Sequence, residues 1–105
     1  MAQFDVYRNP ETAQSRRIPF LLDVQSALLA ALNTTIIVPL YDPAAVNAPP
    51  IHGLMPTFEI EGQPVVMMAP ELAGVPRKKL PQKTSNLTEQ RDVIIAALGL
   101  VLTGV

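Results

Sequence analysis

The sequence predicts a mainly β protein, in which about five or six short antiparallel strands form a small barrel or twisted sheet before one C-terminal helix. Short runs of alternating or β-branched residues recur along most of the chain, as in half-buried strands. Eleven prolines are spread over the 105 residues, which is typical of frequent turns. The only long helical pattern is at the end of the chain.

Size and composition indicate a single domain over residues 1–105. Apolar residues make up 49% of the chain, enough for a modest core. The formal net charge is −1, so the chain lacks the basic excess of a protein that binds nucleic acid directly. There is no cysteine and a single histidine, His52. We therefore expect no disulfide, no metal site and no cofactor.

No membrane-spanning segment or leader is apparent in the sequence. The longest apolar run, residues 93–102, is far shorter than the roughly 20 residues that cross a bilayer. The first residues lead directly into a strand-like pattern and lack the features of a signal peptide. We expect a cytoplasmic protein with no membrane partner.

The first predicted strand covers residues 3–7. Polar and apolar residues alternate there, which directs Phe4 and Val6 inward. Residues 8–17 are polar throughout, so we expect a long and mobile connection.

The second and third strands are predicted at residues 18–24 and 35–40. Pro19 stands at the start of the former, where no ladder donor is lost. The latter is the strongest strand pattern in the chain, because it is rich in β-branched residues, and we expect Pro39 to end it. Residues 25–32 lie between them. Helix propensity favours a short helix there, and the neighbouring strands leave a strand extension or a single helical turn open.

A hairpin is predicted in the second half of the chain. Residues 41–56 carry several prolines and form a loop. Residues 57–60 and 64–68 have strand patterns on either side of Glu61-Gly62-Gln63, where the glycine suits a tight turn. Another short strand begins within residues 71–76.

The terminal helix is predicted to start at Thr88, after the basic and polar connection 77–85. Thr88 can cap the first turn, and Glu89 and Asp92 place negative charge near the positive end of the helix. The following residues are apolar over most of the circumference, so the helix must be covered on more than one side.

A stripe of small or polar residues separates two apolar sides of this helix, when residues are placed at about 100° steps. One apolar side contains Val93, Ala97, Leu100 and Val101, the other contains Ile94, Ile95, Leu98 and Leu102, and the stripe contains Thr88, Asp92, Ala96, Gly99 and Thr103. Gly99 costs about 1 kcal/mol relative to alanine, which the close approach of another chain would explain. On the pattern alone, a solvated face is the simpler interpretation.

The second apolar side of the helix needs another surface to cover it. A copy of the same chain across a two-fold axis supplies that surface. The sequence therefore predicts a homodimer with Leu98, Val101 and Leu102 near the axis.

No group of residues has the pattern of a catalytic site. His52 lies in a proline-rich loop without an evident partner. Glu59 and Glu61 share one face of a strand, as solvated residues do, and residues 77–79 form a short basic patch. We therefore predict that the protein is not an enzyme.

A series of short motifs covers the chain from residue 3 to residue 105. In order, they are Gln-Phe-Asp-Val-Tyr at 3–7, Asp-Val-Gln-Ser at 23–26, Val-Pro-Leu at 38–40, Met-Met at 67–68, Leu-Ala-Gly-Val-Pro at 72–76 and Gly-Val at 104–105. In this order and spacing the sequence resembles the CcdB family. These proteins are toxins of toxin–antitoxin pairs, and they poison DNA gyrase.

The resemblance implies an SH3-like antiparallel barrel with a C-terminal helix, a two-fold dimer and a non-enzymatic mechanism. The family binds the gyrase A subunit through the exposed side of the terminal helix and its last three residues. The corresponding positions here are Asp92, Ala96, Gly99, Thr103, Gly104 and Val105, bordered by Ser26, Leu28 and Leu29. The stripe derived from helical geometry contains four of these positions.

The resemblance also implies a cognate antitoxin whose disordered segment folds on the toxin. The loop after the first strand and the sheet around the hairpin are the expected contacts. The residues assigned to this contact are Arg8, Asn9, Glu59, Val65 and Val66.

The end of the chain departs from the family pattern, which has Trp-Gly-Ile where this chain has Thr103-Gly104-Val105. The family indole stacks on a gyrase arginine, an interaction of roughly 0.5–2 kcal/mol that Thr103 cannot supply. The negative end of the helix can still attract a guanidinium. Two alternatives stay open: an endoribonuclease toxin on a related barrel, and an inert dimeric interaction module or degenerate toxin.

Overall fold

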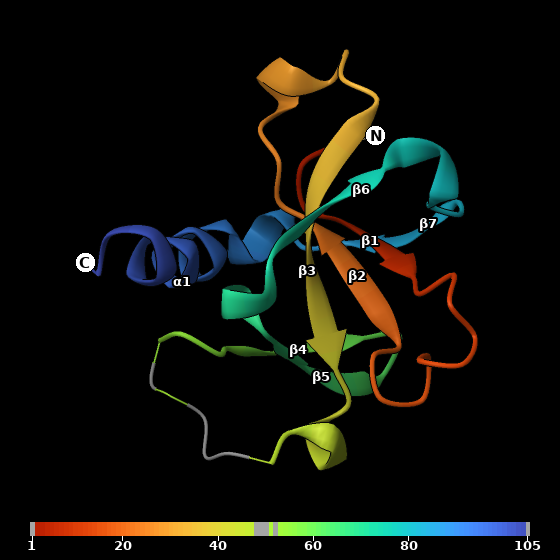
Figure 1. The fold of residues 1–105 in the computed structure, drawn as a ribbon. Coiled ribbons are helices and arrows are strands. Elements are labelled where there is room, and N and C mark those ends of the chain that lie inside the picture. The colour runs from red at the N-terminus through yellow and green to blue at the C-terminus, as the bar shows by residue number, and fades with distance from the viewer. Residues whose placement is uncertain (1, 48–50, 52, 105) are drawn as a thin grey trace.

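A computed structural model describes residues 2–47, 51 and 53–104. Within them, seven strands form a curled antiparallel sheet, and one α-helix extends from its side (Figure 1). The elements are β1 (Asp5–Arg8), β2 (Phe20–Asp23), β3 (Thr34–Tyr41), β4 (Thr57–Ile60), β5 (Gln63–Met67), β6 (Ala73–Pro76), β7 (Lys83–Asn86) and α1 (Arg91–Thr103). The order across the sheet is β4-β5-β3-β2-β1-β7, and β6 also pairs with β3. This architecture confirms the predicted fold class.

The long strand β3 organises the sheet because it has different partners along its length. Its first half pairs with β6 and its end pairs with β5, while β2 follows its other side. Pro39 lies inside β3 rather than at its end, so the prediction that it ends the strand is wrong. The carbonyl of Pro39 accepts from the amide of Met68 at 3.1 Å, between the two ladders. Proline has no backbone N–H to donate, and this loss costs least where a strand is not paired by a regular ladder.

The β4–β5 hairpin turns at Glu61 and Gly62, as predicted. Their φ angles are +53° and +79°, the pair of positive values that defines a type I′ turn. The Glu61 carboxylate accepts from Arg8 Nη2 and from Thr84 Oγ1. These bonds tie the hairpin to β1 and β7 and so draw the two ends of the sheet together.

The core lies inside the curl of the sheet. Phe4 and Val6 are 2% and 0% exposed, which confirms their inward direction. Ile94 and Ala97 of α1 are both 0% exposed and join this cluster. The other fully enclosed core residues include Phe20, Leu22, Val38, Leu40, Ile60, Val65 and Met67.

The segment 25–32 contains a single 3₁₀ turn, Ala27–Leu29, one of the alternatives left open by the sequence. Ser26 caps it, and its Oγ accepts from the amide of Leu28 at 3.1 Å. The loop 8–17 folds as consecutive turns, with bonds such as Gln14 N to Glu11 O at 3.0 Å.

Two boundaries in the last third of the chain were predicted wrongly. β7 lies within the expected connection 77–85 and runs on to Asn86, and it pairs with β1. Its sequence Lys-Thr-Ser-Asn lacks apolar alternation because the strand is a polar edge. α1 begins at Arg91 rather than at Thr88, which belongs to a preceding 3₁₀ turn, Thr88–Gln90. Asn86 Oδ1 accepts from the Thr88 amide at 2.8 Å and takes the capping role.

Candidate functional site

The inner side of α1 is a narrow line of residues that packs on the sheet. Ile94 and Ala97 are fully buried, and Leu98 and Val101 are partly buried against the same core. This line runs between the two apolar sides predicted from the helical wheel and takes residues from both. The helix therefore has one inner side, and its opposite side faces away from the core.

The opposite side of α1 carries the predicted stripe. Asp92, Ala96 and Thr103 are exposed and Gly99 is partly exposed. We call these four residues the outer stripe. The structure thus places the outer stripe at the surface of the chain, and its role in binding gyrase stays a prediction.

The last turn of α1 shapes the end of the outer stripe. Thr103 Oγ1 donates to the Gly99 carbonyl at 2.8 Å. Gly104 has φ +77°, the left-handed conformation common after helices, and its amide donates to the Leu100 carbonyl at 3.1 Å. Val105, also predicted to bind gyrase, lies outside the described residues.

Apolar residues border the outer stripe on both sides. Val93 is 48% exposed and lines a hollow with Phe58 and Leu87, so this border faces β4. Leu102 is 70% exposed and lies on the other border, together with Ile95. The three residues predicted to form the dimer interface therefore differ in exposure. Leu98 and Val101 pack partly on the core of their own chain, whereas Leu102 is mostly exposed.

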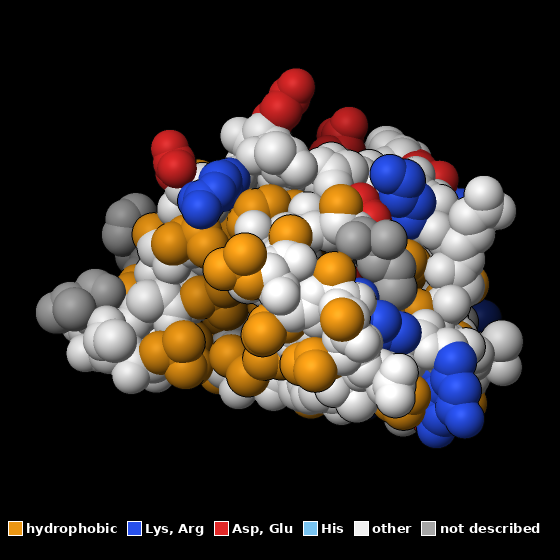
Figure 2. Space-filling model, turned by 90° about the horizontal axis from the view of Figure 1, so that it is seen from above, with side chains coloured by type: hydrophobic (Ala, Val, Ile, Leu, Met, Phe, Trp, Pro, Cys, Tyr) orange, Lys and Arg blue, Asp and Glu red, His pale blue; other side chains and the backbone are white. Residues whose placement is uncertain are grey.

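The 3₁₀ turn that follows β2 adds a second exposed apolar surface. Leu28 is 94% exposed, Leu29 45% and Leu32 49%. Figure 2, which views the molecule from the side of this turn, shows hydrophobic side chains gathered from this region onto α1. Ser26, Leu28 and Leu29 are all exposed, and that they border the gyrase-binding surface stays a prediction.

Polar side chains hold this turn in place. The Asp23 carboxylate accepts from the Gln25 amide at 3.0 Å and from Thr35 Oγ1 at 2.9 Å. Arg77 Nε donates to the Leu32 carbonyl at 2.7 Å, and its Nη2 donates to the Leu29 carbonyl at 3.3 Å. Burial raises the pKa of Asp23, and the hydrogen bonds that its carboxylate accepts from Thr35 and Gln25 act in the opposite direction.

The predicted antitoxin contacts separate into surface and core residues. Arg8 and Glu59 are exposed and Asn9 is partly exposed. Val65 and Val66 are 0% and 5% exposed, so the prediction that their side chains contact a partner is corrected. Both belong to β5, where pairing with β4 and β3 and the enclosing core leave no surface for a partner.

A groove that the sequence did not reveal lies beside the loop 8–17. Its volume is about 510 Å³. The residues that line it include Asn9, Gln14, Ile18, Leu21, Ile37, Pro39, Val75 and Leu80. Leu21, Ile37 and Pro39 alternate with core residues of β2 and β3, so alternation could have indicated an apolar patch on the outer face of the sheet.

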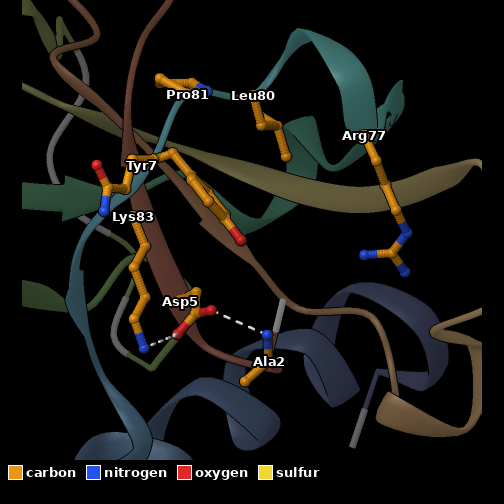
Figure 3. A pocket seen from close by; sticks show the side chains of 8 residues that line it. Ala2, Asp5, Tyr7, Arg77, Leu80, Pro81 and Lys83 are labelled. Carbon is orange, nitrogen blue, oxygen red and sulfur yellow. Dashed lines mark hydrogen bonds and ion pairs between the residues drawn. The ribbon is translucent and has the colours of Figure 1, made fainter.

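A separate cavity of about 400 Å³ lies between β1, β7 and the segment 77–82. Figure 3 shows Asp5, Tyr7, Arg77 and Lys83 around it, with Leu80 and Pro81 on one wall. No prediction from the sequence pointed to this cavity, because its residues come from two segments that are distant in the sequence, 2–7 and 77–83.

Metal-binding and membrane-spanning features are absent from the described part of the chain. Residues 2–47, 51 and 53–104 contain no group of three His, Cys, Asp or Glu side chains suited to a metal ion. No helix in these residues is long and apolar enough to cross a bilayer. His52 lies outside the described residues.

Comparisons with known proteins agree with this architecture. The family model described as "CcdB protein" matches residues 3–104. Among solved structures, an endoribonuclease in complex with its cognate antitoxin, from a mycobacterial species, is similar with a TM-score of 0.74 and 12% identity, covering 97% of this chain and 94% of that one. The Mycobacterium tuberculosis toxin MazF-mt6 is similar with a TM-score of 0.66 and 13% identity, covering 92% of both chains.

No curated protein matches the sequence significantly. At 12–13% identity the two solved structures establish the barrel-like toxin fold alone. The family match, in contrast, extends over nearly the whole sequence. The chain therefore belongs to the CcdB family of toxin–antitoxin toxins.

Proposed function

We propose that this toxin binds the gyrase A subunit through the outer stripe of α1 and inhibits gyrase by occupying it, without chemistry of its own. The observation that carries the proposal is the exposed outer stripe, at the positions that the CcdB family uses, on a chain that matches this family over residues 3–104. None of the four side chains packs into the core of the chain.

The chemistry of the outer stripe suits a close and cationic partner. Ala96 and Gly99 are small, so a partner backbone can approach the helix closely. Asp92 is the one charged member of the stripe, and the carboxyl end of α1 adds partial negative charge. Thr103 Oγ1 donates to the Gly99 carbonyl at 2.8 Å, which holds this side chain against the last turn of the helix.

A two-fold homodimer belongs to the same proposal. Leu102, Leu28 and Leu32 are at least 49% exposed, and exposed apolar surface of this kind is commonly covered in homodimers. A cognate antitoxin is the second expected partner. The groove beside Asn9 and Ile18 offers its segment an apolar surface with polar edges.

An endoribonuclease activity is the second candidate, because the solved structure with a TM-score of 0.74 is an endoribonuclease. RNA cleavage needs a general base and a general acid near the phosphate. Asp5, Tyr7 and Lys83 meet in the 400 Å³ cavity, but Asp5 accepts hydrogen bonds from Ala2 and Asn86. The pKa of Tyr7 is raised to about 12, so its hydroxyl is a poor base at neutral pH. We therefore rank this candidate second.

One experiment separates these functions. The chain is expressed in cells with normal gyrase and in cells whose gyrase A carries a substitution at the arginine that the family contacts. Growth arrest only in the former supports gyrase inhibition. Arrest in both, with cleavage of bulk RNA by the purified protein, supports the endoribonuclease, and arrest in neither supports an inert module. An Ala96→Arg variant should abolish gyrase-dependent arrest, whereas Glu89→Arg, outside the outer stripe, should retain it.

A further inference from the structure

The strand β4 has backbone groups that no neighbouring strand uses. It stands at one end of the sheet and, within the residues that the structure describes, pairs with β5 alone. Ile60 faces Gln63 across the type I′ turn, so these two residues exchange both backbone hydrogen bonds. Alternation along an antiparallel ladder then directs the N–H and C=O groups of Phe58 toward β5, and those of Thr57 and Glu59 away from it.

A hydrogen bond at the start of the strand follows the same alternation. The Pro56 carbonyl accepts from the Met67 amide at 2.8 Å, two positions before Phe58. In the described part of the chain, no loop or turn bonds to the backbone of Thr57 or Glu59. The outer edge of β4 is therefore left without a partner strand.

The opposite end of the sheet is protected in a way that β4 is not. β7 is short and polar, and Lys83 places a charge on it, a common device against the addition of another strand. Its side chains are also engaged, since Thr84 donates to Glu61 and Asn86 donates to Asp5. β4 has neither lysine nor proline in its sequence Thr-Phe-Glu-Ile, so its edge is open to a further strand.

A hollow of about 520 Å³ lies beside the open edge. Two of its lining residues, Phe58 and Leu87, belong to the core and are 8% and 5% exposed. Val93 of α1 lines it as well and is 48% exposed. Glu59 is the one charged residue of this lining, and neither ion pair of the described residues includes it. The hollow thus offers an apolar contact beside an unpaired carboxylate.

We propose that β4 binds an extended peptide segment of a partner protein as an additional antiparallel strand, and that apolar and basic residues alternate in this segment. Residues directly opposite each other in a ladder lie on the same face of the sheet. The residue opposite Phe58 therefore faces the hollow and is apolar. The residue opposite Glu59 lies on the exposed face, where a basic side chain meets the carboxylate.

Backbone hydrogen bonds give such a strand its affinity, and the alternating side chains give it specificity. The lining of the hollow shares no residue with the outer stripe or with the groove beside the loop 8–17. The proposal therefore does not depend on gyrase binding.

The peptide acetyl-Lys-Val-Lys-Val-Lys-Val-Lys-amide is the probe, and amide chemical shifts at constant ionic strength give its Kd. In the protein without peptide, amide hydrogen exchange should be fast at Thr57 and Glu59 and slow at Phe58. Saturation with the peptide should slow exchange at Thr57 and Glu59 at least about tenfold, because their N–H groups then enter a ladder. Unchanged exchange or the absence of saturable shifts would overturn the proposal. Slow exchange at both residues without peptide would also overturn it, since the edge would then already be covered.

N-methylation divides the peptide into a test and a matched control. In the proposed pairing the lysine N–H groups point to β4, and the valine N–H groups point away from it. Methylation of the two inner lysine nitrogens should raise the Kd at least about tenfold, whereas methylation of two valine nitrogens should leave it nearly unchanged. The same composition in blocks, Lys-Lys-Lys-Lys-Val-Val-Val, should bind about tenfold more weakly. Equal Kd values for the two methylated peptides would contradict strand addition.

Two protein variants test the edge from the other side. Glu59→Gln should raise the Kd about threefold, the contribution of an exposed ion pair. Glu11→Gln removes the same charge from the loop 8–17 and should leave the Kd unchanged. Thr57→Pro removes one outward N–H at a position where strands tolerate proline, and it should raise the Kd about fivefold. Equal Kd values for Glu59→Gln and Glu11→Gln would refute a basic partner. Native-like amide spectra of the variants would exclude misfolding as the cause of a lost affinity.

Discussion

Single residues determine how the exposed surface of this toxin can act. Thr103 occupies the position at which the family pattern has an indole, and its hydroxyl donates to the helix carbonyl of Gly99 at 2.8 Å. Asp23 is 2% exposed, yet it supports the turn that carries Leu28. Both residues can be changed without removing an apolar side chain from the core, so a single substitution can test each role.

Thr103→Trp should strengthen binding to the gyrase A subunit if the outer stripe is the binding surface. An indole stacked on an arginine contributes about 0.5–2 kcal/mol, which is about 2-fold to 30-fold in Kd. Isothermal titration with purified gyrase A checks this. Thr103→Val is the control, because it removes the same hydroxyl without adding a ring, and it should leave Kd nearly unchanged. An unchanged or weaker affinity of Thr103→Trp would count against the outer stripe as the site.

Asp23→Asn should make the protein more stable at pH 7. Because the pKa of Asp23 is raised in the folded state, folding favours the protonated carboxyl, and stability falls as pH rises from the ordinary carboxyl pKa through the raised value. Asparagine keeps an oxygen for Thr35 and Gln25 without the charge. Urea unfolding at several pH values should show the difference between variant and wild type shrinking to zero at acid pH. A difference that grows on acidification would contradict this assignment.

At the scale of elements, packing on one side leaves the other side available to a partner. α1 buries only a line through Ile94 and Ala97, so the outer stripe remains exposed. The 3₁₀ turn Ala27–Leu29 contributes no buried residue. Hydrogen bonds therefore define the position of this turn. Arg77 donates to the Leu29 carbonyl, and Asp23 accepts from the Gln25 amide just before the turn.

Arg77 should be the main support of this turn, because it binds the carbonyl groups of both Leu29 and Leu32. Arg77→Lys keeps the charge but loses the planar fork. We expect a loss of about 1–2 kcal/mol in the free energy of unfolding and altered amide shifts for residues 26–33. Lys78→Ala, an exposed cation on the same turn as Arg77, should leave both unchanged. If the two variants behave alike, Arg77 does not position the turn.

At the scale of the whole molecule, the sheet is curled by contacts between its ends. Glu61 in the β4–β5 turn accepts from Arg8 of β1 and Thr84 of β7. This closure encloses the core on one side and leaves the exposed leucines of α1 and the 3₁₀ turn outside it. This surface is the one that the proposed homodimer would cover.

Leu102→Asp should convert the proposed homodimer into a monomer. Leu102 is 70% exposed, so the change should leave the fold intact while it places a charge in the apolar contact. Sedimentation at micromolar concentration should give a dimeric mass for the wild type and a monomeric mass for the variant. Val93→Asp, on the opposite border of α1, should remain dimeric. A wild-type monomer under these conditions would refute the dimer.

The amino-acid sequence by itself determined the strand-rich class, the hairpin turn at Glu61-Gly62, the inward direction of Phe4 and Val6 and the exposed side of α1. All of these depend on local periodicity or on turn residues, which neighbouring positions encode. The tertiary structure decided what distant pairing controls: the polar strand β7 beside β1, the passage of β3 through Pro39, the burial of Val65 and Val66, and the cavity under Tyr7. These features depend on which segments meet when the sheet curls, and no single segment carries that information.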